Sequence, residues 1–201
     1  MRTLAVVSMV LGSVTLATAQ IEVTAETMGK GKVAAFVSAN AIVAKDFTTL
    51  SFSTAQVWYG LNNRLDVFAG ASETIALGQK QTAVQVGGNL TLLKGKGWAL
   101  STFNVLSTPL NRRSDASDVL WLAAVVVSKN LTIHGFAFTP YSGYAVTVPL
   151  GNVDDKLFTP AEPMHNVPLG VMVPKGKFAF FAEYNFGRKQ QIGGVGLAYT
   201  F

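Results

Sequence analysis

Segments of about ten residues, in which large apolar side chains alternate with small or polar ones, recur along this chain. Residues 64–73, 82–93 and 177–187 show the alternation most clearly. Because successive side chains of a strand point to opposite faces, each segment is predicted to be a strand with one apolar face and one small or polar face. A mainly helical fold is disfavoured, since helices need an apolar repeat of about 3.6 residues.

This alternation, together with the turn residues between segments, predicts ten strands. We expect them at about 33–44, 48–61, 64–73, 82–93, 98–108, 118–128, 132–147, 166–174, 177–187 and 191–201. The Ala-rich segment 32–46 would also suit a helix, but Phe36, Val37 and Ile42 favour a strand. Segments 98–108 and 118–128 do not alternate cleanly, and their two faces stay unassigned.

The predicted connections alternate between short and long along the chain. Tight turns are expected at 61–64, 94–97, 128–131 and 174–177, and long links at 109–117 and 151–166. Outer-membrane barrels have short periplasmic turns and longer external loops, so both termini are expected on the periplasmic side. The expected fold is therefore all-β, a closed antiparallel up-and-down transmembrane β-barrel of about ten strands.

Two other strand numbers are compatible with the sequence. Twelve strands would result if residues 21–28 formed a strand and residues 140–143 split the long seventh strand, but several tight turns would then lie outside. Eight strands would require a clear hairpin to be discarded. Ten strands keep every tight turn at one end.

Residues 1–19 have the layout of a secretory signal peptide. Arg2 is followed by an apolar run, and small residues precede the expected cleavage point after Ala19. The run is shorter than the roughly 20 residues that span a bilayer. We expect an N-terminal periplasmic segment at residues 20–31 and a single barrel domain at residues 32–201.

The composition leaves two classes of barrel open. The chain has no cysteine, so disulfides and thiolate metal sites are excluded. Only 13% of its residues are charged, and its mean hydropathy is +0.34. Such a chain can cross a membrane as a closed barrel, because closure satisfies the backbone hydrogen bonds. A soluble secreted barrel of lipocalin type, with the apolar parity turned inward around an apolar ligand, is the alternative.

The placement of charged and aromatic residues favours the membrane barrel. Nearly all lysines and arginines fall at turns or strand ends, whereas a soluble barrel would carry some of them in mid-strand. Aromatic residues gather near the strand ends, as in the belts at membrane interfaces. The belts expected are Trp58, Tyr59, Trp98, Phe178, Tyr199 and Phe201 at the periplasmic rim, and Phe47, Trp121, Tyr141, Tyr144 and Phe186 at the outer rim.

The chain ends on GVGLAYTF, with Tyr199 two residues before the terminal Phe201. This ending, together with GLNNRLDVFAG and FAFFAEYNFG, resembles bacterial outer-membrane β-barrel proteins of the small porin-like class. The resemblance implies that the last strand closes the barrel against the first and is read by the barrel assembly machinery of a Gram-negative bacterium. It also implies a location in the outer membrane, with outer-membrane lipid and lipopolysaccharide as partners.

Five polar residues on the small or polar parity are predicted to line the lumen: Asp66, Gln85, Asn89, Glu183 and Asn185. Carboxylates in an open pore would favour cations. However, a ten-stranded barrel is only slightly wider than the eight-stranded kind, whose interior the side chains fill. We therefore expect a filled or very narrow lumen, with Arg64 as the nearest candidate to pair with Asp66.

No catalytic or metal-binding constellation stands out, and no cofactor is expected. The expected function is a narrow channel, or a structural or adhesive barrel, without catalytic activity. His165 shares a predicted loop with Asp154 and Asp155, and the resemblance keeps an outer-membrane rim enzyme as a further alternative.

The cations are spread over both rims, so no nucleic-acid surface is predicted. Four cations at the outer rim are candidates for contacts with lipopolysaccharide phosphates: Arg112, Arg113, Arg188 and Lys189.

Overall fold

The computed structural model describes residues 24–44, 50–76, 79–110, 119–150, 163–188 and 190–201. Over these ranges the chain is all-β, and no described helix has the length and apolarity to cross a membrane. The predicted strand boundaries are confirmed to within a few residues. The strands are β1 (Val33–Ala44), β2 (Leu50–Gly60), β3 (Leu65–Ala76), β4 (Gln79–Gly95), β5 (Trp98–Pro109), β6 (Val119–Lys129), β7 (Leu131–Ile133), β8 (Phe136–Leu150), β9 (Met164–Lys175), β10 (Phe178–Gly187) and β11 (Gln190–Thr200).

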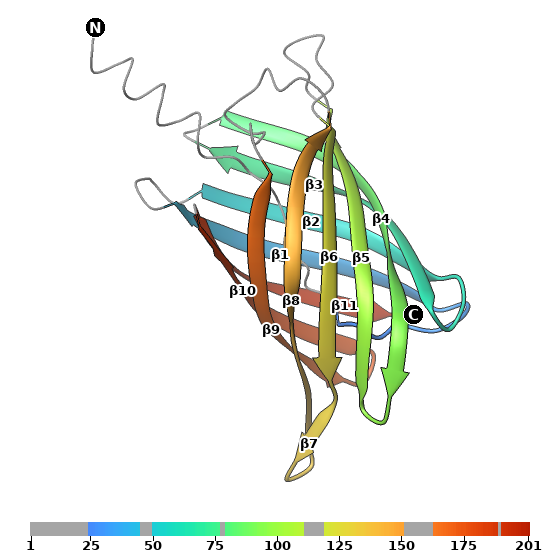
Figure 1. The fold of residues 1–201 in the computed structure, drawn as a ribbon. Coiled ribbons are helices and arrows are strands. Elements are labelled where there is room, and N and C mark those ends of the chain that lie inside the picture. Colours follow the sequence, from blue (N-terminus) through green and yellow to red (C-terminus); the bar gives the residue numbers. More distant parts are fainter. Residues whose placement is uncertain (1–23, 45–49, 77–78, 111–118, 151–162, 189) are drawn as a thin grey trace, which may run out of the picture.

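Ten of these strands close into an antiparallel barrel (Figure 1). Neighbours in sequence pair with each other, β6 pairs directly with β8, and β11 returns to pair with β1. The closing register runs from Ala34↔Thr200 to Ala44↔Gln190. The twelve-strand alternative is wrong for the described residues, because residues 24–28 form no strand and β8 runs unbroken through residues 140–143.

The hairpin that joins β6 to β8 is longer than predicted. The prediction of a tight turn at 128–131 is wrong, because the chain continues into β7, which pairs with the start of β8. It turns instead at His134 and Gly135, whose φ angles are 49° and 80°. Glycine adopts positive φ without steric cost, which makes this position a better turn than the Lys-Asn pair before it. The resulting β7 hairpin projects beyond the barrel wall (Figure 1).

The large apolar parity faces outward and the small or polar parity faces inward. In β10, for example, Phe178, Phe180 and Phe186 are 44–49% exposed, whereas Glu183 and Asn185 are 5% and 0% exposed. The same arrangement holds in β3, β4 and most of β11. β5 and β6 fail to alternate because both of their faces carry apolar side chains: Phe103, Val105, Leu122 and Val126 point inward and are buried, while Leu106 and Val125 are exposed on the outward face.

An aromatic layer fills the interior. The Trp58 ring stacks on Phe68 with 4.4 Å between centroids, and Phe68 stacks on Phe103 at 5.7 Å. Trp58 and Tyr141 were candidates for the rim belts, and this assignment is wrong because both are buried inside. Both side chains lie on the inward parity of their strands, which is why they are buried in the core.

A polar layer adjoins the aromatic one. The indole N–H of Trp58 donates to Gln56 Oε1 (2.9 Å), and Gln56 Nε2 donates to Gln85 Oε1 (3.1 Å). Gln85 Nε2 in turn donates to the Ser72 hydroxyl (3.3 Å). This chain of hydrogen bonds joins β2, β3 and β4 across the inner face. The buried amides therefore have partners inside the barrel rather than water.

The inner-face glycines make room for the aromatic rings. A side chain on Gly170 would overlap the ring of Tyr141, its partner residue on β8. We expect Gly170→Ala to destabilise the barrel by about 1–3 kcal/mol, the usual cost of overpacking. In a Tyr141→Ala background the same substitution is expected to cost almost nothing. Urea unfolding in detergent, followed by tryptophan fluorescence, measures both costs.

Gly193→Ala is the matched control for this experiment. Its added methyl group would make only ordinary van der Waals contacts with Tyr184 on the outward face, so little change is expected. An equal cost of Gly170→Ala with and without the Tyr141 ring would contradict the steric explanation.

Candidate functional site: the barrel interior and its N-terminal strap

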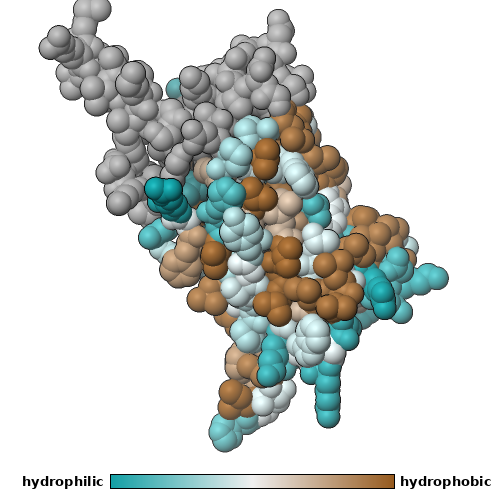
Figure 2. Space-filling view, viewed as in Figure 1, coloured by the Kyte–Doolittle hydropathy of each residue, from teal (hydrophilic) through white to brown (hydrophobic). Residues whose placement is uncertain are grey.

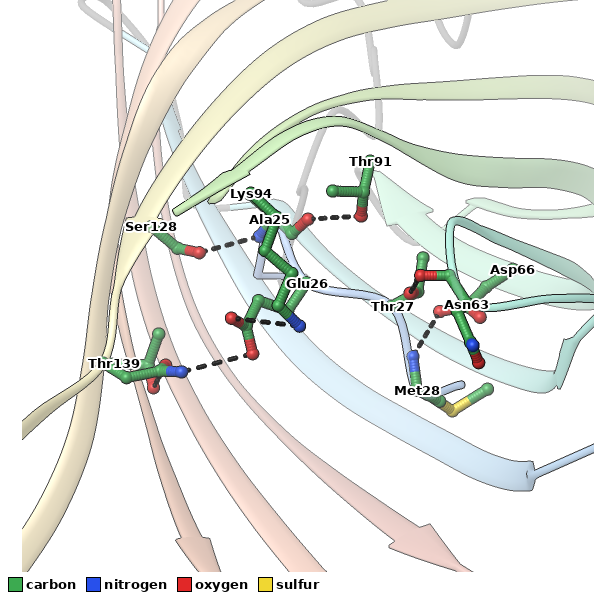
Figure 3. Close-up of polar contacts among 11 residues, drawn as sticks. Ala25, Glu26, Thr27, Met28, Asn63, Asp66, Thr91, Lys94, Ser128 and Thr139 are labelled. Carbon is green, nitrogen blue, oxygen red and sulfur yellow. Dashed lines mark hydrogen bonds and ion pairs between the residues drawn. The ribbon is translucent and has the colours of Figure 1, made fainter. Parts of the chain in front are cut away.

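Residues 24–32, which we call the N-terminal strap, precede β1 and cross the inside of the barrel (Figure 3). Ala25 is fully buried: its N–H donates to the Ser128 hydroxyl (3.1 Å), and its carbonyl accepts from the Thr91 hydroxyl (2.9 Å). Asn89 Nδ2 donates to the carbonyl of Thr24 (3.3 Å). The strap therefore lies at the barrel end that carries the short turns, which we call the turn end.

The next residues fix the strap to several strands. Glu26 pairs with Lys94 on β4 at 3.5 Å and accepts from Asn130 Nδ2 at 3.2 Å. The Met28 N–H donates to Asp66 Oδ2 on β3 at 2.8 Å. Contacts to both sides of the ring mean that the strap spans the turn end rather than following one wall (Figure 3).

The structure places all five predicted lumen residues inside the barrel, where each is buried. They form three groups rather than one ring. Asp66 and Asn89 hold the strap, Gln85 belongs to the hydrogen-bond chain described above, and Asn185 Nδ2 donates to Glu183 Oε1 at 2.6 Å.

The expected pairing of Asp66 with Arg64 is not found among the described residues. Asp66 Oδ2 accepts from the strap backbone instead, and Arg64 is exposed to solvent. The strap itself was missed by sequence reasoning, which placed residues 20–31 outside the barrel domain. The sequence offered a weak signal: the polar residues Thr24 and Glu26 alternate with Ala25 within residues 21–28, the segment that the twelve-strand alternative treats as a strand.

The two histidines lie at opposite ends of the barrel. His165 lies in β9 rather than in a loop, faces outward, and has its Nδ1 2.6 Å from the Tyr144 hydroxyl. His134 lies in the turn of the β7 hairpin. Asp154 and Asp155 lie outside the described residues. Among the residues with described positions, no group of three or more metal-ligating side chains comes together.

The closing strand carries the predicted terminal aromatics on its outward face. The Tyr199 ring lies between Phe178 (4.9 Å) and Phe201 (5.1 Å), and Lys177 Nζ is 5.7 Å from its centroid. The N–H of Phe201 donates to the Val33 carbonyl at 3.0 Å, which ties the C-terminus to the first strand. The aromatic pair thus lies directly at the seam between β11 and β1.

The predicted rim cations are described only in part. Arg188 follows β10 at the opposite end from the strap, which we call the loop end, and is exposed. Arg112, Arg113 and Lys189 lie outside the described residues, as do the signal-peptide residues 1–19 and Phe47 of the outer belt.

Comparison with known proteins finds similarity to solved structures but not to a family model or a curated sequence. No protein-family model matches the chain, and no curated protein matches it in sequence. Among solved structures it is similar to the KdgM porin (11% identity, 84% of this chain and 99% of that chain, TM-score 0.43) and to LpxR from Salmonella typhimurium (10%, 84% and 99%, 0.45). It is also similar to the beta domain of the Bordetella autotransporter BrkA (13%, 86% and 100%, 0.45). At these identities the likeness concerns the barrel architecture alone.

Proposed function

We propose that this chain is a small outer-membrane β-barrel of a Gram-negative bacterium that serves a structural role, with a closed lumen and no catalytic centre. The observation that carries the proposal is the orientation of its two faces. A water-soluble barrel buries its apolar parity and wets the other, whereas this barrel does the reverse.

The outward wall is too apolar for contact with water. Val57, Val86, Leu169 and Val195 lie in mid-strand on different parts of the ring and are all more than half exposed. Figure 2 shows hydrophobic residues over much of the visible wall, with the most hydrophilic residues gathered toward the barrel ends. Exposed apolar surface of this extent marks an interaction with lipid or protein.

The interior does not suit the soluble, lipocalin-like alternative. Asn89, Asn185 and Glu183 point into it and are buried, together with the Gln56–Gln85 chain. An apolar ligand in contact with these groups would leave their hydrogen bonds unsatisfied, which is costly. A membrane barrel has an apolar exterior and an interior that accommodates polar groups. Here the exterior is apolar, and the interior holds these polar groups beside the aromatic layer.

Polar and aromatic pairs on the outward face support a membrane interface near the loop end. Tyr144 contacts His165, Tyr184 donates to Gln191, and Glu73 pairs with Lys80 at 3.2 Å. At the turn end, Tyr59, Trp98 and Phe178 are exposed on the same face. Such side chains are typical of the depth at which lipid headgroups lie, because the apolar ring can contact the acyl chains while the polar tip contacts water or headgroups.

The proposal includes export and assembly as the resemblance implies them. A signal peptide cleaved after Ala19 would deliver the chain, and the assembly machinery would read Tyr199 and Phe201. Outer-membrane lipid would surround the wall, with lipopolysaccharide phosphates meeting Arg188 and the other rim cations. A closed structural barrel is favoured over a narrow channel because the strap and the aromatic layer both cross the interior.

Two matched lysine substitutions test the membrane location. Val86 and Ile133 are about equally exposed apolar residues, but Val86 lies in mid-wall and Ile133 in the projecting β7 hairpin. Val86→Lys is expected to lower barrel stability in lipid vesicles by about 2–4 kcal/mol, and Ile133→Lys by far less. The wild type is expected to need detergent for extraction and to migrate differently on gels after heating. Solubility without detergent, or equal effects of the two lysines, would contradict the location.

Planar-bilayer recordings test the closed lumen. The refolded wild type is expected to show no conductance steps or very small ones. Deleting residues 20–31 alone should change little, because the aromatic layer remains. Adding Phe68→Ala and Phe103→Ala to the shortened chain should open small steps, whereas Phe180→Ala and Phe186→Ala on the outward face should not. Large, stable steps from the wild type would show that the lumen is open.

Deletion of Phe201 tests the assembly signal. The deletion removes apolar area worth about 1.5–3 kcal/mol in contact with lipid, and also the terminal aromatic that the machinery would read. The folded amount in the outer membrane of cells is expected to fall far more than for Thr200→Ala. Refolding yield in detergent should fall only mildly, because there only the packing loss remains. Equal, wild-type-like levels of both variants in cells would show that the terminal aromatic has no special role.

A further inference from the structure

A cavity of about 160 Å³ lies inside the turn end, next to the strap. Most of its wall is apolar or aromatic: Met28, Ala34, Phe36, Trp58, Met172 and Phe181. Phe36 and Phe181 meet edge to face at 5.6 Å, and Trp58 packs one side of its ring on Phe68. The strap and the inner faces of β1, β2, β3, β9, β10 and β11 thus line a small, largely apolar space.

One carboxylate in this wall is left without a cation. Asp66 is 2% exposed, and its Oδ1 has no hydrogen-bond partner among the described residues, while Oδ2 accepts from Met28 N–H. The other carboxylate at the cavity, Glu26, is neutralised by Lys94 and accepts from Asn130. A buried carboxylate with a free oxygen is costly unless a positive charge approaches it.

The chemistry of the wall points to one class of cation. A primary ammonium carries three N–H donors that all need acceptors. Besides Asp66, the polar side chains of the wall are those of Glu26, which is already paired, and of Thr24 and Thr200, while the rest of the wall is carbon and sulfur. A quaternary ammonium has no N–H groups and is attracted to aromatic rings and to a nearby carboxylate. We propose that this cavity binds a small quaternary ammonium ion, with Asp66 as its counter-ion and Phe36, Trp58 and Phe181 around its methyl groups.

Such a group could arrive as a free cation or as a lipid headgroup. We expect the free cation to bind more tightly, because a phosphate next to the ammonium would be repelled by the Asp66 carboxylate. Choline and phosphocholine are therefore the two probes. Tighter binding of phosphocholine than of choline would assign the site to the headgroup rather than to a free solute.

Trp58 offers a direct readout. The chain has three tryptophans, and Trp98 and Trp121 are exposed on the outward face. In a Trp98→Phe, Trp121→Phe background, refolded in an uncharged glucoside detergent, choline is expected to change Trp58 fluorescence saturably. The neutral isostere 3,3-dimethylbutan-1-ol, which has the same shape without the charge, should not. Asp66→Asn should weaken choline binding by about tenfold or more.

Two further variants keep the test decisive. Glu183→Gln removes another buried carboxylate that does not line the cavity, and it should leave choline binding unchanged. Ala198→Leu adds bulk to the cavity wall from β11 while keeping Asp66 in place, and it should abolish binding, which guards against misfolding of the Asp66 variant. No saturable response to choline, an equal response to the isostere, or full binding by a folded Asp66→Asn or Ala198→Leu chain would overturn the proposal.

Discussion

Backbone hydrogen bonding between β1 and β11 is the interaction on which the rest of this structure depends. The two strands pair along their whole length, from Ala34↔Thr200 to Ala44↔Gln190. Without that seam, both would present rows of unpaired N–H and C=O groups, which lipid cannot satisfy. Closure therefore allows the outer surface of the wall to be apolar. The Phe201 N–H extends the hydrogen bonding between β11 and β1 by donating to the Val33 carbonyl.

Closure with ten strands also limits the space inside. The ring is only a little wider than the eight-stranded kind whose interior side chains fill completely, so bulky inner residues must be offset by small ones. The Phe68 ring fits because Gly87 has no side chain, and the Tyr141 ring fits because Gly170 has none. Pairing a ring with a glycine on the neighbouring strand lets the barrel hold an aromatic layer without widening, and that layer favours a closed structural barrel over a channel.

The strap completes the interior at the turn end with polar rather than apolar contacts. Hydroxyls of Thr91 and Ser128 bond its backbone, and Lys94 balances the charge of Glu26. Asp66 is a buried carboxylate that lines a cavity with aromatic and thioether walls, and its second oxygen has no hydrogen-bond partner among the described residues. Buried charge is tolerated when it is paired, and this is the reason for proposing that a cation binds beside Asp66.

The sequence by itself determined the strand segmentation, the antiparallel barrel and the face each clean strand shows. These depend on a repeat of two residues that is local to each strand, as in Leu65, Val67 and Asp66. The tertiary structure alone decided that Trp58 and Tyr141 lie inside, that β5 and β6 place apolar side chains on both faces, and that the β6–β8 hairpin turns at His134. It also decided that the strap enters the barrel. Which inner side chains meet depends on the register of strands far apart in the chain, and closure of the whole ring sets that register.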